Sequence, residues 1–218
     1  MNLIIDFDST FVQVEALEEL AKIALQNNPE KERIIKEIKI ITDLGMEGKI
    51  PFSESLSRRI AMLRATKNHL EELKIFLKNK VSSSILQNMN FFQKFRENIF
   101  IISGGFLEFI KPAVADFEIP HKNIFANSFL FDDRGNIFGA NKHNPLAKDG
   151  GKILQTKKLS LPRPICVIGD GFTDYQIKEA GEADIFIAFT ENVTRPTVVK
   201  KADFAANNLN EAIKYLKL

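Results

Sequence analysis

The sequence has no tryptophan, two tyrosines and a single cysteine, Cys166. One cysteine cannot form an intramolecular disulfide, so nothing in the sequence points to an oxidising compartment. Cys166 lies in the apolar run ICVIG, and we expect it to be a buried core residue. The 19 phenylalanines supply most of the aromatic side chains, and we expect them to fill the core.

The chain also lacks an excess of charge and a long apolar run. Its 30 basic and 28 acidic residues give a net charge of +2, too balanced to indicate a nucleic-acid or membrane partner. No apolar run approaches the roughly 18 residues of a membrane-spanning helix. The start, MNLIIDFD, has no basic segment and soon reaches an acid, so we expect no secretory signal. The default expectation is a cytoplasmic enzyme.

Short apolar runs alternate with helical patterns along most of the chain. The runs at 3–6, 99–105, 165–171 and 184–189 are apolar on both faces, which is typical of parallel strands covered on both sides. Helical patterns follow each run, which predicts an α/β fold with a Rossmann-like, doubly wound, mostly parallel sheet. The stretch 123–140 instead predicts a hairpin of two extended pieces around the turn DDRGN.

A long helical block interrupts this alternation. From about residue 14 to residue 80 the pattern is helical throughout, and Pro29 and Pro51 stand where helices would begin. A helical block inserted between the first strand and the rest of the sheet predicts a cap. We therefore divide the chain into an α/β catalytic core, residues 1–13 and 81–218, and a helical cap, residues 14–80.

Polar residues stand at the carboxyl ends of three predicted strands. The first strand ends in Asp6 and Asp8, the second in Ser103 and two glycines, and the third in Asp170, with Asp174 close behind. Ligands of open α/β sheets bind outside the carboxyl ends of the strands. If these strands are parallel neighbours, their polar residues converge on one site.

The chemistry of these residues predicts phosphoryl transfer. Clustered carboxylates imply a cation, and oxygen ligands suit Mg²⁺, which often bridges carboxylates to a phosphate. Glycine N–H groups and a hydroxyl suit the phosphate oxygens. An aspartate nucleophile would give an aspartyl-phosphate, and a second carboxylate two residues on can act as acid and base. A lysine would complete the charge balance: Lys152, after Gly-Gly at a helix start, is preferred, and Lys148 is the alternative.

The chain resembles the haloacid dehalogenase superfamily in four motifs, in the family's order: DFDST at 6–10, SGGF at 103–106, GGK at 150–152 and GDGFTD at 169–174. The resemblance covers the core from end to end and implies that superfamily's fold. It also implies that Asp6 is the nucleophile and a Mg²⁺ ligand. Asp8 would be the acid and base, with its main-chain carbonyl on the metal. Asp170 would be the third ligand, and Asp174 would orient metal waters or the lysine.

The same resemblance implies a phosphate site and a substrate edge. Ser103, Gly104 and Lys152 would hold the phosphate, and Thr173 would lie at the edge of the substrate. The segment between Lys152 and Asp170 is shorter than the family pattern, and Lys148 would restore a more usual spacing without the Gly-Gly match.

Two further segments resemble the phosphoserine phosphatase branch of that superfamily. The first motif runs on to Glu15, where the branch has a glutamate that faces the substrate amino group. The cap segment MEGKIPFSESLSRR implies that Arg59 binds the substrate carboxylate, with Met46 and Phe52 packed around it. The implied activity is Mg²⁺-dependent hydrolysis of O-phospho-L-serine to serine and phosphate, a reaction on a small phosphorylated amino acid.

One segment, FTENVTRP at 189–196, departs from the branch pattern. We expect its residues Thr190, Asn192 and Arg195 to shape a loop; added contacts to the site are the alternative. Two other functions remain open. A phosphatase or phosphotransferase of another small metabolite would share this core, and a non-catalytic phosphate-responsive module would share the clustered aspartates. The sequence does not indicate whether the protein is a monomer or a homodimer.

Overall fold

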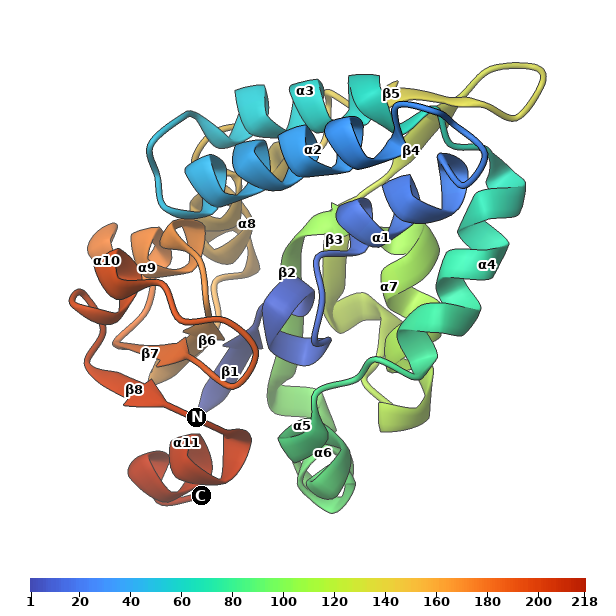
Figure 1. Ribbon diagram of the computed structural model, residues 1–218. Coiled ribbons are helices and arrows are strands. Elements are labelled where there is room, and N and C mark those ends of the chain that lie inside the picture. The colour runs from blue at the N-terminus through green and yellow to red at the C-terminus, as the bar shows by residue number, and fades with distance from the viewer.

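A computed structural model describes residues 1–218, and its main sheet has six strands that are parallel throughout (Figure 1). The strand order is β3-β2-β1-β6-β7-β8. The strands are β1 (Asn2–Ile5), β2 (Ile99–Phe106), β3 (Ile124–Asn127), β6 (Ile165–Gly169), β7 (Ile185–Phe189) and β8 (Phe204–Ala206). The predicted α/β fold with a parallel, doubly wound sheet is confirmed.

Both faces of the sheet are buried, which explains the continuous apolar runs. In β1, Leu3 and Ile5 belong to a hydrophobic cluster on one face, while Ile4 belongs to a cluster on the other. Successive side chains of a strand point to opposite faces, so a central strand needs apolar residues at every position. The helices that cover the two faces are α7 (Leu107–Val114) and α11 (Leu209–Leu216) on the first, and α8 (Gly151–Leu159), α9 (Phe172–Glu179) and α10 (Pro196–Val199) on the second.

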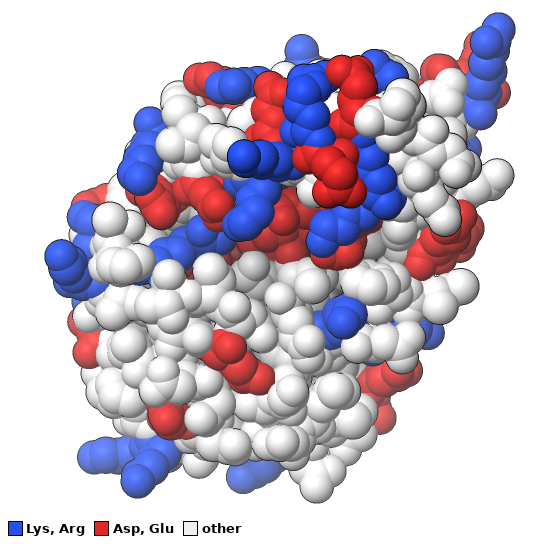
Figure 2. Space-filling view, viewed as in Figure 1, with Lys and Arg blue, Asp and Glu red and all other residues white.

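A helical layer, residues 16–78, lies over the carboxyl ends of the strands and continues down one side of the core beside α7 (Figure 1). It consists of α1 (Ala16–Ala24), α2 (Lys31–Met46), α3 (Phe52–Leu63) and α4 (Lys67–Lys78). Helix α2 buries Ile34, Ile38 and Ile41 at helical spacing. Lys and Arg are interspersed with Asp and Glu on the outside of this layer (Figure 2). No helix of the chain is both long enough and apolar enough to cross a membrane.

The chain enters and leaves the helical layer through two segments that lie side by side. Val12 and Val81 form an antiparallel bridge, and the Gln13 N–H donates to the Lys80 carbonyl at 2.8 Å. The Ser82 N–H donates to the Phe11 carbonyl at 2.9 Å. Two short helices, α5 (Ser83–Gln87) and α6 (Met89–Phe95), then lead into β2. The layer is therefore an excursion whose two ends meet at the core.

The stretch 123–140 forms more than the predicted hairpin. Its first piece is β3, which pairs in parallel with β2 at the edge of the main sheet. The hairpin is made by β4 (Phe129–Phe131) and β5 (Ile137–Ala140) around the predicted turn, where the Asp132 carboxylate accepts the N–H groups of Arg134 and Asn136. An extended pattern indicates a strand but does not indicate its partner, so the prediction of two pieces missed the edge strand.

Candidate active site

The two acids that follow β1 are presented by a tight turn, Phe7–Phe11. The Phe7 and Phe11 rings are fully buried and stacked, with their centroids 6.2 Å apart, and they anchor the turn from below. Ser9 takes a left-handed backbone conformation, φ 54°, which is uncommon for a residue other than glycine. This reversal holds Asp6 over the end of β1, where its carboxylate accepts the Phe7 N–H at 2.7 Å.

Lys152 joins the acid of β1 to the acid of α9. Its Nζ lies 2.8 Å from Asp6 Oδ1 and 2.7 Å from Asp174 Oδ1, and its side chain is 7% exposed. Burial lowers the pKa of Lys152, but Asp174 and Asp6 outweigh burial and leave the pKa above its ordinary value. Lys148, the alternative candidate, forms no ion pair and lines the neighbouring hollows. The geometry thus brings Lys152, not Lys148, to the acids.

Three buried carboxylates meet beside this lysine. One oxygen from each of Asp6, Asp170 and Asp174 lies within 4.8 Å of the others. Asp174 packs so closely on Gly169 that a Cβ there would lie 2.3 Å from the carboxylate carbon. An all-oxygen set of buried acids fits a hard divalent cation such as Mg²⁺. The Asp8 side chain lies outside this set, because its carboxylate accepts the Ala16 N–H at 2.8 Å.

Burial and mutual repulsion raise the pKa values of these acids. Burial, with Glu15 and Asp6, raises the pKa of Asp170 to about 7, although Arg195 opposes the shift. Burial and Asp6 raise the pKa of Asp174 to about 8 against the effect of Lys152. Burial, Glu15 and Asp6 also raise the pKa of Asp8 well above its ordinary value. A protonated Asp8 is what a general acid requires.

Ten of the residues predicted to bind or react with substrate line a single pocket. They come from both the sheet and the helical layer: Asp6, Asp8, Glu15, Met46, Phe52, Arg59, Ser103, Gly104, Lys152 and Thr173. Asp170 and Asp174 reach Asp6 from beneath this pocket. The fold therefore brings together residues that lie up to 167 positions apart, from Asp6 to Thr173.

Glycines let the helical layer approach the sheet closely. The Phe52 ring lies against Gly104, where a Cβ would stand 2.5 Å from the ring. The Met46 sulfur lies against Gly171, 3.3 Å from the position of a Cβ there. Among the sheet residues that line the pocket, Ser103 Oγ accepts the Gly105 N–H at 2.9 Å. Met46 and Phe52 thus close the pocket from above, while Ser103 forms part of its floor.

Arg59 and Glu15 lie at the layer side of the pocket with opposite charges. The Arg59 side chain is 3% exposed, and its one hydrogen bond is from Nε to the Ser55 carbonyl at 3.3 Å. Its terminal N–H groups remain available to a ligand. Burial lowers the pKa of Arg59, while Glu15 and Asp8 raise it. Glu15 accepts the Ser9 hydroxyl at 2.6 Å, which fixes one of its carboxylate oxygens.

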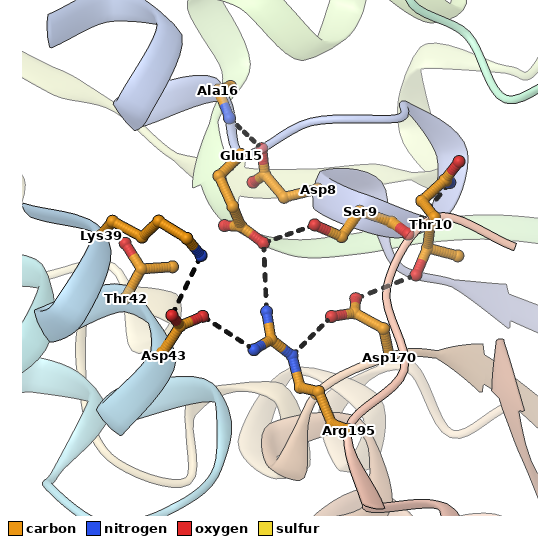
Figure 3. A network of polar contacts seen from close by, with 12 residues as sticks. Asp8, Ser9, Thr10, Glu15, Ala16, Lys39, Thr42, Asp43, Asp170 and Arg195 are labelled. Carbon is orange, nitrogen blue, oxygen red and sulfur yellow. Dashed lines mark hydrogen bonds and ion pairs between the residues drawn. The ribbon is translucent and has the colours of Figure 1, made fainter. Parts of the chain in front are cut away.

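Arg195 joins the site, although sequence reasoning expected it to shape a loop (Figure 3). Its Nε donates to Asp170 Oδ2 at 3.1 Å, and its Nη1 donates to Asp43 Oδ1 of α2 at 3.1 Å. Its Nη2 lies 3.6 Å from Glu15 Oε1. Its partners are distant in sequence, so no local pattern marked it. Of the other residues in this segment, Thr190 donates to the Ala206 carbonyl and does shape the loop.

Comparison with known proteins finds relatives along nearly the whole chain, although no protein-family model matches it. The chain is 30% identical to the phosphoserine phosphatase of Mus musculus over 97% of its length, and covers 91% of that protein. It is 30% identical over 91% of its length to the chloroplastic phosphoserine phosphatase of Arabidopsis thaliana, of which it spans 66%.

Two solved structures are similar to the chain over almost all of its residues. A phosphoserine phosphohydrolase-like protein from Francisella tularensis has a TM-score of 0.89 at 33% identity, with 99% of each chain covered. A phosphoserine phosphatase solved as a phospho-aspartyl intermediate analogue has a TM-score of 0.77 at 25% identity, with 98% of this chain and 97% of that chain covered.

Proposed function

The chain belongs to the phosphoserine phosphatase family of haloacid dehalogenase-type hydrolases, and we propose that it hydrolyses O-phospho-L-serine to serine and phosphate. The resemblance predicted from four short motifs is thereby confirmed, and the chain is a phosphatase. In this proposal residues 1–13 and 81–218 are the catalytic core. Residues 14–80 are a cap that supplies substrate contacts.

The choice of phosphoserine rests on one observation: Glu15 and Arg59 line the same pocket as Asp6 and Asp8. A carboxylate suits the substrate ammonium, and a buried guanidinium suits the substrate carboxylate. Met46, Phe52 and Thr173 line the space around these two groups. A ligand with a phosphate at Asp6 and an amino acid between Glu15 and Arg59 would complement the charges of the pocket.

The reaction proceeds in two steps on the chain's own residues. Asp6 attacks phosphorus, the bond to the serine oxygen breaks, and Asp8 gives that oxygen a proton. Asp8, now ionised, takes a proton from a water that attacks the aspartyl-phosphate, which releases phosphate and restores both acids. Ser103, Gly104 and Lys152 hold the phosphate oxygens throughout.

We further propose that the acids at the pocket floor hold Mg²⁺. Asp6, Asp170 and the main-chain carbonyl of Asp8 would be its protein ligands, with Asp174 fixing Lys152 beside them. When bound, the ion would neutralise the repulsion between the phosphate and Asp6. The oxygen-only chemistry of the acid cluster supports this assignment.

A phosphate-release screen tests the substrate. The wild-type protein should release phosphate from L-phosphoserine in the presence of MgCl₂ and lose this activity in EDTA. O-phosphoethanolamine, which lacks the carboxylate, and glycerol 3-phosphate, which lacks both charged groups, should be poorer substrates by roughly 10-fold or more in kcat/KM. A higher kcat/KM for either ester would assign the site to another metabolite, and stoichiometric labelling without turnover would indicate a binding module.

The raised pKa values predict a pH-dependent effect of Mg²⁺ on stability. Asp170 and Asp174 hold protons in the folded chain up to about pH 7 and pH 8, whereas in the unfolded chain they lose them near pH 4. The folded state therefore loses stability as pH rises through this interval. Since a metal binds the ionised carboxylates, MgCl₂ should raise the Tm more at about pH 8.5 than at about pH 6.

Differential scanning fluorimetry in EDTA and in MgCl₂ measures this effect, with KCl at equal ionic strength as the control. A Tm increase that is equal at both pH values, or larger at the lower one, would contradict it.

A further inference from the structure

The loop 190–195, between β7 and α10, is fastened to both connections of the helical layer. Asn192 Nδ2 donates to the Ser9 carbonyl at 3.1 Å and to Ser82 Oγ at 2.7 Å. The Glu191 carboxylate accepts the Ser84 N–H at 3.0 Å. The loop thus touches the chain just before it enters the layer and just after it leaves. These hydrogen bonds fix the backbone of the loop that carries Arg195.

Arg195, at the end of this loop, contacts three carboxylates on three separate segments (Figure 3). The Arg195, Asp170 and Glu15 side chains are 5%, 2% and 11% exposed, so water screens these two contacts little, whereas Asp43 is 40% exposed. Asp170 belongs to the proposed metal site, Glu15 to the proposed ammonium site, and Asp43 to α2. A planar guanidinium can hold several acceptors in fixed directions, which a lysine ammonium cannot do.

Two of these carboxylates have a second partner in the turn after β1. The Thr10 hydroxyl donates to Asp170 Oδ1 at 3.1 Å, and the Ser9 hydroxyl donates to Glu15 Oε1 at 2.6 Å. These hydroxyls hold the acids in place but carry no charge. What Arg195 adds is a positive charge shared by both acids and a link to α2.

We propose, building on the function assigned above, that Arg195 is a positioning residue that couples the metal site, the ammonium site and helix α2. Its charge offsets part of the negative charge of Asp170 and so weakens the hold of that acid on a divalent cation. The N–H donors of its planar guanidinium hold Glu15 and α2 in the arrangement that receives the amino acid. One guanidinium thereby affects both the affinity for the metal and the affinity for the substrate.

Arg195→Met separates this role from a structural one, because methionine is long and apolar but uncharged. In isothermal titration calorimetry with MgCl₂ alone at about pH 9, where Asp170 is ionised, the variant should bind Mg²⁺ roughly fivefold more tightly than the wild type. Its KM for phosphoserine should rise roughly tenfold. Damage to the fold would weaken both affinities. Unchanged or weaker Mg²⁺ binding would overturn the proposal.

Two further variants separate the charge of Arg195 from its geometry. Arg195→Lys keeps the positive charge and loses the planar set of guanidinium N–H donors. The Kd of Mg²⁺ should therefore match the wild type, while the KM for phosphoserine rises. Asp43→Asn removes the ionic link between Arg195 and α2, together with the ion pair between Asp43 and Lys39 within that helix, and should do the same. A wild-type KM in either variant would refute the role of these donors, and the lysine variant decides this point even if Arg195→Met does not fold.

The control is Arg96→Met, which removes an exposed arginine paired with Glu118 and should change neither constant. The Mg²⁺ titration needs no substrate. If the wild-type protein failed to hydrolyse phosphoserine, the proposed function would fall, while the effect of Arg195 on Mg²⁺ binding would still be measured.

Discussion

Asp6→Asn is expected to lower kcat for phosphoserine by about 10⁴-fold or more, because an amide cannot attack phosphorus. Asp6 is 5% exposed and its carboxylate lies 2.8 Å from the Lys152 ammonium. Of the three acids that line the pocket, only Asp6 is held against Lys152, since Asp8 accepts the Ala16 N–H and Glu15 accepts the Ser9 hydroxyl. Phosphate release under saturating MgCl₂ and substrate measures the loss.

Mass spectrometry of acid-quenched reactions adds a direct test of the intermediate. The wild-type protein should carry one phosphoryl group on the peptide that contains Asp6, and the Asp6→Asn protein should carry none. Asp116→Asn, which alters an exposed acid on the surface, is the matched control and should retain wild-type kinetics. A kcat of Asp6→Asn within tenfold of the wild type would rule out Asp6 as the nucleophile.

Arg59→Ala is expected to raise the KM for phosphoserine by roughly 10²-fold or more, because truncation of one member of a buried charge pair costs several kcal/mol. Arg59 is 3% exposed, and its terminal N–H groups are not used within the protein. The change should be selective: hydrolysis of O-phosphoethanolamine, which has the ammonium but no carboxylate, should fall far less. The measurement is the ratio of kcat/KM for the two substrates.

Arg58→Ala provides the control for this prediction. Arg58 is the sequence neighbour of Arg59, but its side chain is 48% exposed and pairs with Glu54 on the surface. This variant should keep the wild-type preference for phosphoserine. A preference that also survives Arg59→Ala would show that Arg59 does not bind the substrate carboxylate, and would return the choice of substrate to the wider superfamily.

Much of the core could be predicted because its signals are local. An apolar run that ends in an acid or in Ser-Gly-Gly marks a buried parallel strand with its carboxyl end at a ligand site, as β1, β2 and β6 do. The edge strand β3 was not predicted. Its pairing with β2 depends on the burial of Ile124 and Ala126 in the folded chain and not on any residue nearby in sequence.

The residues of the site also differ in whether a local sequence signal marks them. Asp6, Ser103 and Lys152 could be predicted because each lies in a short motif at a strand end or helix start. The place of Arg195 could not, because its contacts with Asp170, Glu15 and Asp43 span 25, 180 and 152 positions. The contact with Asp43 arises only when the helical layer packs over the sheet, and the contact with Asp170 joins the loops that follow β7 and β6.

The bridge between Val12 and Val81 has a consequence for how this protein could be remodelled. The chain between these two residues leaves the core and returns to the neighbouring position, so the entropic cost of closing an insertion there rises only slowly with its length. Glu15, Met46, Phe52 and Arg59 all lie inside this interval, whereas Asp6, Ser103, Lys152 and Asp170 lie outside it. In the proposed function, the residues that select the substrate therefore lie in a segment that could be exchanged, and the residues that react lie in the rest of the chain. Replacement of the segment between residues 12 and 81 offers a route to a phosphatase that keeps the same nucleophile and acts on another metabolite.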